Sequence, residues 1–363
     1  MSSKFVHLHT HSHYSLLDGL IKIDDMVDEA IKMGMPAIAL TDHGSMYGAI
    51  EFYKKCQKAG IKPIIGVETY VALESMTQKR PNIDNKRHHL ILLAKNEIGY
   101  KNLLKIVTAS YLEGYYYKPR TDKDFLRKHS EGLIALSACM AGEVSRMIER
   151  KDPERAEKAA REYEDIFGKG NFYIEISHHP DIENHTNIQK GLVELARRIN
   201  IPLVATQDAH YIKPEDAMAQ DILVAIQTNA ELADANRLTM KLDNFSMRSG
   251  EEMEKLFKDN PDAIENTFKI AEMCDIKLNL GKWVFPKLDL EGNQNPEEYL
   301  TESAKRNYLK MFGDNDIDGE VKKRLEYELE VITSKGYAPY FLIVADLITF
   351  AKNKKIFTNT RGS

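Results

Sequence analysis

The stretch Phe5-Val6-His7-Leu8-His9-Thr10-His11-Ser12 decides both the fold and the candidate site. It begins with apolar residues that favour an extended strand, and it then places His9 and His11 two positions apart. Side chains two residues apart in an extended segment point to the same side, so these two imidazoles are expected to converge. Neutral imidazole nitrogens bind zinc, iron and manganese. The stretch therefore predicts a strand that ends in a metal site.

Six further short apolar runs follow along the chain, and most of them precede a helical pattern. The runs lie at residues 37–40, 63–67, 90–93, 132–136, 172–176 and 202–205. Apolar residues at helical spacing predict helices at 24–33, 49–59, 98–111, 143–149, 153–167 and 186–198. Alternating strands and helices are typical of a parallel sheet with crossover helices. Seven such units predict an α/β fold built on a closed or nearly closed seven-stranded (β/α) barrel.

At the ends of these predicted strands lie residues whose side chains can bind a metal ion. In barrels of this kind the chemistry lies at the carboxyl ends of the strands. The candidate ligands are His9, His11, Asp18, His43, Glu68, His89, Cys139, Asp208 and His210. His89 stands at the start of its run instead of the end, so it joins the site only if a local irregularity turns it there. Taken alone, His43 could lie in a turn and Cys139 could be a small buried side chain, but their coincidence at strand ends favours one shared site.

The size and chemistry of this set indicate more than one ion. Nine donors exceed what a tetrahedral ion needs, so we expect two or three divalent ions bridged by carboxylates, with Asp18 and Glu68 as bridges. Mixed imidazole, carboxylate and thiolate donors favour zinc, with manganese and iron as alternatives. Closely spaced ions suit phosphoester hydrolysis, because they acidify a bound water and hold both the attacking and the leaving oxygen. Asp42, beside His43, is expected to orient a ligand.

A second stretch combines aromatic and cationic side chains. The candidate nucleic-acid-binding residues are Tyr115, Tyr116, Tyr117, Lys118 and Arg120. Interleaved aromatics and cations can stack bases and hold phosphates of single-stranded nucleic acid. The alternative is that the tyrosines pack a loop and that Arg120 pairs with Asp122 or Asp124.

Composition limits the classes of protein that the chain can represent. Its formal net charge of -5 over 363 residues excludes a uniformly basic nucleic-acid binder, so any contact with DNA must be a local patch. Three cysteines do not form a disulfide framework and suit a reducing compartment. The chain shows no apolar run of signal-peptide length at its start, and none reaches the ~18 residues of a membrane span. We therefore expect a cytoplasmic protein with no membrane partner.

The pattern changes after residue 212, where helices dominate. Helical spacing predicts helices at 216–228, 251–257, 261–274, 295–311, 318–335 and 340–354. A region rich in Gly, Asn and Pro at 279–294 marks a boundary. We therefore expect the barrel strands within residues 1–212, a helical extension over 213–280, and a linker with a further helical part over 281–363. Residues 358–363 show no closing element and are interpreted as a cut inside a larger protein.

Several motifs are similar to those of a known family, the polymerase-and-histidinol-phosphatase (PHP) domain. They are His9-Thr10-His11-Ser12, Leu17-Asp18-Gly19, Thr41-Asp42-His43-Gly44, Gly66-Val67-Glu68 and Asp208-Ala209-His210. The closer resemblance is to the family of bacterial replicative DNA polymerase III alpha subunits, in their N-terminal part. It is carried by the segments 5–19, 89–96, 114–120, 136–139 and 205–211, and the segment 336–344 resembles the start of the palm domain of that family.

The resemblance implies a distorted seven-stranded barrel of PHP type with a three-metal site, and all nine ligand types are present here. An intact set implies a metal-dependent 3′–5′ exonuclease that could proofread, in which a metal-bound hydroxide attacks the terminal phosphodiester of a single-stranded DNA 3′ end. Other replicase subunits would be partners of the full-length protein. The polymerase carboxylates of the family lie beyond the palm start, so this chain should not polymerise DNA.

The chain departs from this family in one loop, and two other functions compete with that of an exonuclease. The family usually has a glycine-rich loop before Arg-Gly-Ser, whereas Phe357-Thr358-Asn359-Thr360 stands there in this chain, which puts the phosphate-holding role of that loop in doubt. The alternatives to an exonuclease are a free-standing phosphatase that acts on a small phosphate monoester, and a non-catalytic scaffold. The palm-like segment and the tyrosine segment favour the exonuclease of a replicative polymerase over both alternatives.

Overall fold

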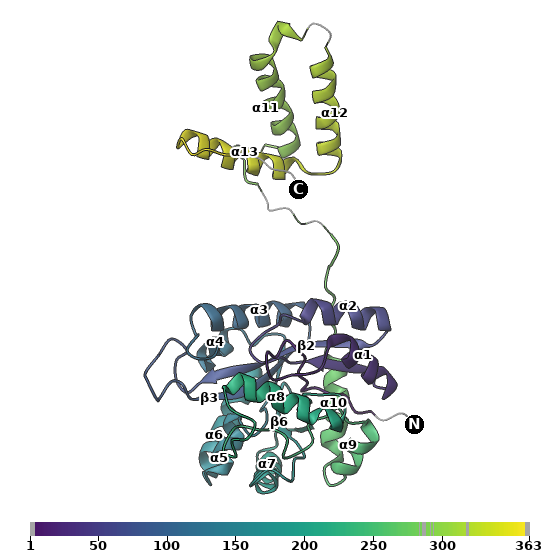
Figure 1. Cartoon of the computed structure of the whole chain (residues 1–363), viewed down its shortest axis with the longest axis vertical. Coiled ribbons are helices and arrows are strands. Elements are labelled where there is room, and N and C mark those ends of the chain that lie inside the picture. The colour runs from purple at the N-terminus through teal and green to yellow at the C-terminus, as the bar shows by residue number, and fades with distance from the viewer. Residues whose placement is uncertain are drawn as a thin grey trace. The chain divides into compact units, whose positions relative to one another are not determined.

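A computed structural model of the chain (Figure 1) describes residues 4–282, 284, 288–290, 292, 294–316 and 319–359. The chain forms two compact units, residues 1–278 and 279–363. The division falls at the start of the region rich in Gly, Asn and Pro. All of the candidate ligands belong to the first unit.

The first unit is built on one curled mixed sheet, which confirms the α/β barrel-like fold. Its strands are β1 (Ala37–Leu40), β2 (Lys62–Ala72), β3 (Arg87–Ala94), β4 (Arg120–Thr121), β5 (Leu133–Leu136), β6 (Phe172–Ile176) and β7 (Leu203–Ala205). Their order is β1-β2-β3-β5-β6-β7, and β4 pairs with β2. The short strand β4 carries too few residues to show a periodicity, which is why the sequence did not predict it.

Helices surround this sheet, and α2 and α3 run along one side of it in Figure 1. The helices of this unit are α1 (Ile23–Lys32), α2 (Ala49–Ala59), α3 (Glu97–Leu112), α4 (Lys123–Lys128), α5 (Glu143–Glu149), α6 (Pro153–Phe167), α7 (His185–Ile199), α8 (Ala217–Thr228), α9 (Gly250–Leu256) and α10 (Pro261–Met273), with a short 3-10 turn at Pro214–Asp216. The helices predicted at 49–59, 143–149 and 153–167 are confirmed. Local signals explain α6, because the Asp152 carboxylate accepts a hydrogen bond from the backbone N–H of Arg155 and Pro153 suits the first turn.

The expectation of an all-parallel sheet is wrong for one strand. β1 pairs with β2 in parallel, and β5, β6 and β7 are parallel to one another, but β3 runs antiparallel to both β2 and β5. The connection from β2 to β3 contains no crossover helix, so the chain reverses there instead of returning to the same edge. β3 therefore starts at the edge where its neighbours end. This reversal, and not a local irregularity, brings His89 to the end of the barrel that carries the site.

The N-terminal segment links the two ends of the strand order. Contrary to the prediction, residues 5–8 do not form a regular strand, but backbone hydrogen bonds join the segment to both of its neighbours. On one side the carbonyl of His7 accepts a hydrogen bond from the N–H of Ala39 in β1 at 2.9 Å. On the other side the N–H of His11 donates to the carbonyl of Ala209, after β7, at 2.8 Å. The segment therefore bridges the first and last strands and fixes His9 and His11 between them.

The interior of the barrel is apolar below the site. Ile64 of β2 and Tyr173 of β6 are buried in one apolar cluster together with Ile270 of α10. Alternate side chains of a strand face the same side, so Glu68 continues the face of Ile64 and Glu175 continues the face of Tyr173. Two carboxylates thus face the interior above its apolar filling.

The second unit is helical, as predicted. It contains α11 (Pro296–Met311), a 3-10 turn at Gly313–Asn315, α12 (Glu320–Ser334) and α13 (Ala338–Asn353). The Asn295 side chain accepts hydrogen bonds from the backbone N–H groups of Glu297 and Glu298 and so fixes the start of α11. Thr360 and the Arg-Gly-Ser sequence at 361–363 lie outside the described residues. Within the described part of the chain, no single helix is long and apolar enough to cross a membrane, and one bent pair, α12 with α13, meets those criteria by length and composition only.

Acid should destabilise the metal-free protein through His185, at the start of α7. Burial, together with the neighbouring His179, lowers its pKa from 6.5 to about 4. Between these two pH values the unfolded chain binds a proton that the folded chain does not, so stability is complete above pH 6.5 and falls as the pH drops towards 4. His185→Gln, which keeps a polar partner for the Ser177 hydroxyl, should make this fall shallower.

The measurement is the urea midpoint of the metal-free protein as a function of pH. His13→Gln removes an exposed imidazole and serves as the matched control, with the wild-type slope expected. An equal slope for His185→Gln and wild type would contradict the role of His185.

Candidate metal centre

The structure brings the predicted ligands together at one end of the barrel. The N-terminal segment supplies His9, His11 and, further along, Asp18, and the remaining ligands come from β2, β3 and the loops after β1, β5 and β7. A cavity of about 500 Å³ opens there. Its walls include Asp18, His43, Glu68, His89, Cys139, Asp208 and His210. His9 and His11 lie directly behind this wall, in contact with Glu68 and Asp208.

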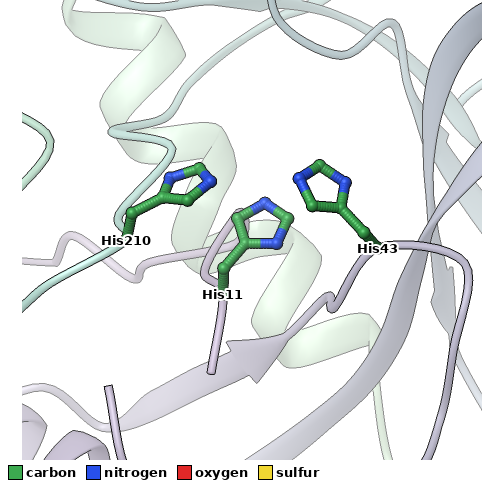
Figure 2. Close-up of side chains that lie close together, drawn as sticks. All are labelled: His11, His43 and His210. Atoms are coloured by element: carbon green, nitrogen blue, oxygen red, sulfur yellow. The ribbon is translucent and has the colours of Figure 1, made fainter. Parts of the chain in front are cut away.

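Figure 2 shows His11 between His43 and His210, and the rings of these three residues lie close together. The centroid of the His11 ring lies 4.2 Å from that of His43 and 4.3 Å from that of His210, and both pairs are stacked. Three groups of donors have their ligand atoms within 4.8 Å of one another. These groups are His9, His11 and Asp208; His11, His43 and His210; and His43, Glu68 and His89.

The Glu68 carboxylate is at the centre of the cluster. One oxygen lies 2.7 Å from Nδ1 of His43 and 3.3 Å from Nε2 of His11. The other oxygen lies 2.6 Å from Nδ1 of His89. Burial alone would raise the pKa of Glu68, but His43 and His89 hold it well below its usual range. The carboxylate is therefore ionised and within reach of donors from three separate segments, as a bridging ligand would be.

Two aspartates complete the acidic side of the cavity. Oδ1 of Asp208 lies 3.1 Å from Nε2 of His9 and 3.3 Å from Nε2 of His11. Oδ2 of Asp18 lies 2.8 Å from Nε2 of His43. Despite burial, neighbouring imidazoles keep the pKa of both carboxyl groups below the usual range. The cavity thus carries three ionised carboxylates.

The backbone is held in an uncommon conformation next to three of these ligands. Asp208 itself, Leu17 before Asp18 and Ala138 before Cys139 have φ of 53°, 60° and 62°. A non-glycine residue in this left-handed region costs about 1–2 kcal/mol. Strain of this kind persists where the surrounding structure enforces it, and it is concentrated at functional sites.

A buried acid that the sequence reasoning missed orients His9. The carboxylate of Glu175 in β6 accepts a hydrogen bond from Nδ1 of His9 at 2.7 Å and another from the Thr206 hydroxyl at 2.6 Å. With Nδ1 protonated, Nε2 of His9 presents its lone pair to the cluster. A sequence signal was present, because Glu175 is the single charged residue in the apolar strand Phe172–Ile176.

Asp42 acts on the ligands through Ser15. The Ser15 hydroxyl donates to Oδ1 of Asp42 at 2.9 Å and lies 2.9 Å from Nδ1 of His11. Because the hydroxyl has one hydrogen and gives it to Asp42, Nδ1 of His11 must be the donor in the second contact. Nε2 of His11 then carries the lone pair that faces the cluster. The sequence reasoning expected Asp42 to orient a ligand, and these contacts provide a route through the hydroxyl.

The buried polar atoms fit a bound cation. Within the described residues, five cluster atoms are buried without a hydrogen-bond partner: Nε2 of His9, Nε2 of His11, Nδ1 of His43, Oε2 of Glu68 and Oδ1 of Asp208. An unsatisfied buried polar atom costs about 1–3 kcal/mol, and more when it is charged. Imidazole nitrogens and carboxylate oxygens are the donors that zinc, manganese and iron take, and divalent ions among them would satisfy all five atoms.

Cys139 lies further from the other donors than the histidines and carboxylates of the three compact groups do. Its side chain lines the cavity, but among the described residues its sulfur belongs to none of the three compact donor groups. Burial, together with the charges of Asp208 and Glu68, raises the pKa of its thiol well above the usual value. The sulfur would therefore become a ligand only where a bound cation compensates its deprotonation.

The tyrosine segment is divided between surface and interior. The prediction that Arg120 belongs to a binding surface is wrong. Its guanidinium is fully buried and donates to the backbone carbonyls of Gly114, Asp84, Met76 and Gln78 at 2.7 to 3.0 Å. A buried cation needs such partners, so Arg120 fixes two loops instead. It does not pair with Asp122 or Asp124 either.

Three other residues of the segment, Tyr115, Tyr117 and Lys118, border a second hollow of about 350 Å³ next to the cluster. Tyr115 and Tyr117 are exposed and line it together with Lys118, Tyr47 and Tyr111. His43 belongs to the walls of both hollows. Tyr116 is half-buried and its ring contacts the Arg120 guanidinium. The exposed tyrosines thus lead directly to the metal cavity.

Two family models match the chain. The PHP domain matches residues 7–179, and the bacterial DNA polymerase III alpha NTPase domain matches residues 298–363. The DNA polymerase III subunit alpha of Borreliella burgdorferi is 46% identical over 98% of this chain and 31% of its own length. That of Treponema pallidum is 42% identical over 97% of this chain and 30% of its own length. The chain thus spans about a third of these relatives.

Among solved structures, a two-domain protein from Bacteroides vulgatus that contains a predicted PHP-like metal-dependent phosphoesterase aligns with a TM-score of 0.35 at 17% identity. The alignment covers 72% of this chain and 62% of that protein.

Removing the charge of Glu175 should weaken metal binding. Glu175→Gln keeps the shape of the side chain but removes the ionised acceptor of His9 Nδ1, so the affinity for zinc or manganese should fall by about 10–100-fold. Titration calorimetry of the metal-free chain measures this change. Glu194→Gln, an exposed acid on α7, is the matched control and should bind metal as wild type does. A wild-type affinity for Glu175→Gln would show that the contact does not orient a ligand.

Proposed function

Because the chain belongs to the PHP-domain family, in the form found in the N-terminal region of bacterial DNA polymerase III alpha subunits, we propose that its cluster is a multinuclear metal centre that hydrolyses phosphodiesters at the 3′ end of single-stranded DNA. The observation that carries the proposal is the convergence of five buried ligand atoms at one site, which lie against one another but form no aligned hydrogen bond within the described residues. The context is DNA replication, with DNA and the other replicase subunits as partners of the whole protein.

The proposed ligands divide into three overlapping groups. His9, His11 and Asp208 would hold one ion, and His43, Glu68 and His89 a second. A third would lie by His11, His43 and His210, where Asp18 approaches His43 and His210. Zinc is the ion that this donor set favours, with manganese and iron as alternatives. Bound divalent ions in such a centre supply Lewis-acid activation of water and neutralise charge on the phosphate.

The residues of the chain contribute orientation and exclusion of water. Glu175 and Ser15 hold the rings of His9 and His11 so that each Nε2 faces the cavity. These two histidines are fully buried, and the Glu68 side chain is almost so, which keeps bulk water away from the inner ligands. A low local dielectric strengthens every charge interaction with a phosphate that enters.

The exposed tyrosines support a nucleic-acid substrate. Tyr115 and Tyr117 border the hollow beside His43, and aromatic rings at such a position stack on the bases of a single strand. Lys118 lies in the same wall, with its ammonium 5.7 Å from the centre of the Tyr70 ring. A strand whose terminal phosphodiester lies in the cavity could therefore place a base among these tyrosines.

One comparison of substrates separates the proposal from its alternatives. The chain is incubated with 3′-labelled single-stranded DNA and with a chromogenic phosphate monoester, with and without zinc or manganese. We expect stepwise shortening of the DNA that needs metal, and a loss of about a hundredfold or more in His9→Ala and in Asp208→Asn. His13→Ala, an exposed histidine nearby, should retain activity.

Hydrolysis of the monoester alone would identify a small-molecule phosphatase. Absence of metal-dependent turnover of either substrate would leave a scaffold role.

Loss of the tyrosine rings should weaken DNA binding without changing the metal centre. Stacking contributes about 1–3 kcal/mol per base, so Tyr115→Ala with Tyr117→Ala should raise KM for single-stranded DNA about tenfold or more, with the metal content unchanged. Tyr327→Ala, an exposed tyrosine of the second unit, is the control. An unchanged KM in the double variant would exclude stacking at this hollow.

A further inference from the structure

A third hollow, next to the metal cavity, is lined by several cationic side chains. It has a volume of about 480 Å³. Its walls include Lys86, Arg87, Arg146 and Arg150, together with His88 and His89. His89 and Arg146 also belong to the walls of the metal cavity, so the two hollows adjoin. We call this feature the cationic pocket.

The four cations of this pocket have no acidic partner. Among the described residues, no carboxylate oxygen lies within the 4.0 Å of an ion pair from Lys86, Arg87, Arg146 or Arg150, although most other arginines of the first unit form such pairs. Of the two acids on α5, Glu143 already accepts hydrogen bonds from Lys123 and from Tyr163. Glu149 lines the metal cavity together with Arg146 but forms no ion pair with the four cations among the described residues. No ion pair among the described residues therefore neutralises the positive charge of the pocket.

Local geometry makes this accumulation of charge costly. Arg146 lies in the last turn of α5 and Arg150 directly follows the helix, four residues along, a spacing at which like charges repel. Nε of Arg146 and Nε of Arg87 are buried and have no hydrogen-bond partner within the described part of the chain. The Arg87 guanidinium is fixed from two sides, by the carbonyl of Asn85 at 2.8 Å and by the Tyr70 ring at 5.3 Å. Donors that are preorganised but unsatisfied are the pattern of an anion-binding site.

We propose that the cationic pocket binds a backbone phosphate of the DNA strand whose terminal phosphodiester lies in the adjoining metal cavity. The inference rests on the proposed function and specifies its substrate as an oligonucleotide, because a monoester has no second phosphate to place there. Planar guanidinium groups bind phosphate through paired hydrogen bonds, which suits a phosphodiester better than a neutral ligand. The formal net charge of -5 makes such a local group of cations the means by which this chain holds a polyanion.

The arrangement of the three hollows supports a nucleic-acid strand, and not a free phosphate ion, as the ligand of the cationic pocket. The tyrosine-lined hollow shares His43 with the metal cavity, and the cationic pocket shares His89 with it. His43 and His89 contact different oxygens of the Glu68 carboxylate. Contacts for bases and contacts for phosphates thus flank the same metal ligand, as an extended nucleic acid requires.

The test measures binding separately from hydrolysis. Fluorescence anisotropy of a labelled oligothymidylate follows its binding to the full 363-residue chain in EDTA, where nothing is cleaved. Arg146→Gln with Arg150→Gln should weaken binding about tenfold or more and reduce the dependence of log Kd on log salt by about one phosphate contact or more. Lys158→Gln with Lys190→Gln removes two exposed cations from α6 and α7 outside the pockets and should leave both quantities unchanged.

A second readout uses substrates of different length in the presence of metal. A second double variant, Lys86→Gln with Arg150→Gln, changes residues that line the cationic pocket but not the metal cavity. It should raise KM for the oligonucleotide while the hydrolysis of a small chromogenic phosphodiester stays at the wild-type rate. Wild-type affinity and salt dependence in a folded double variant would overturn the cationic pocket as a phosphate site. An effect on binding with no hydrolysis of any substrate would instead contradict the proposed function and leave the pocket standing.

Discussion

The constraint on which the structure depends is the burial of ionisable side chains whose lone pairs face one another. Oδ1 of Asp208 lies 3.1 Å from Nε2 of His9 and 3.3 Å from Nε2 of His11, and the three atoms form no aligned hydrogen bond. Burying such groups unpaired costs several kcal/mol in total. The strained backbone at Asp208 adds to this cost. A fold keeps such an arrangement where a bound cation recovers the energy.

Three structural devices hold this arrangement in place. The N-terminal segment is hydrogen-bonded on both sides and brings two histidines between the first and last strands. The antiparallel β3 turns His89 towards Glu68, which is itself placed by the alternation along β2. Glu175 and Ser15 then fix which nitrogen of each inner ring faces the cavity. Each device acts on ligands from a different part of the chain, so the site forms only when the barrel is complete.

The sequence predicted the features that local patterns determine. Helices such as Ala49–Ala59 and the strand Phe172–Ile176 have clear periodicity and end signals, and the candidate ligands follow apolar runs as residues at strand ends do. The direction of β3 could not be read in this way, because an apolar run does not show which way its strand is paired. Glu175 stood out as a charge within an apolar strand, but only its contact with His9 gives it a role. The burial of Arg120 was hidden for a similar reason, since its partners are backbone carbonyls from distant loops.

The central claim is that side chains from residue 9 to residue 210 share a small group of cations. Anomalous diffraction from crystals of the chain grown with zinc or manganese, recorded on both sides of the absorption edge of the metal, tests this claim most directly. The account predicts two or three anomalous peaks inside the cavity, within coordination distance of His9, His11, Glu68 and Asp208. A cavity without anomalous peaks at saturating metal, or peaks confined to surface residues, would contradict it.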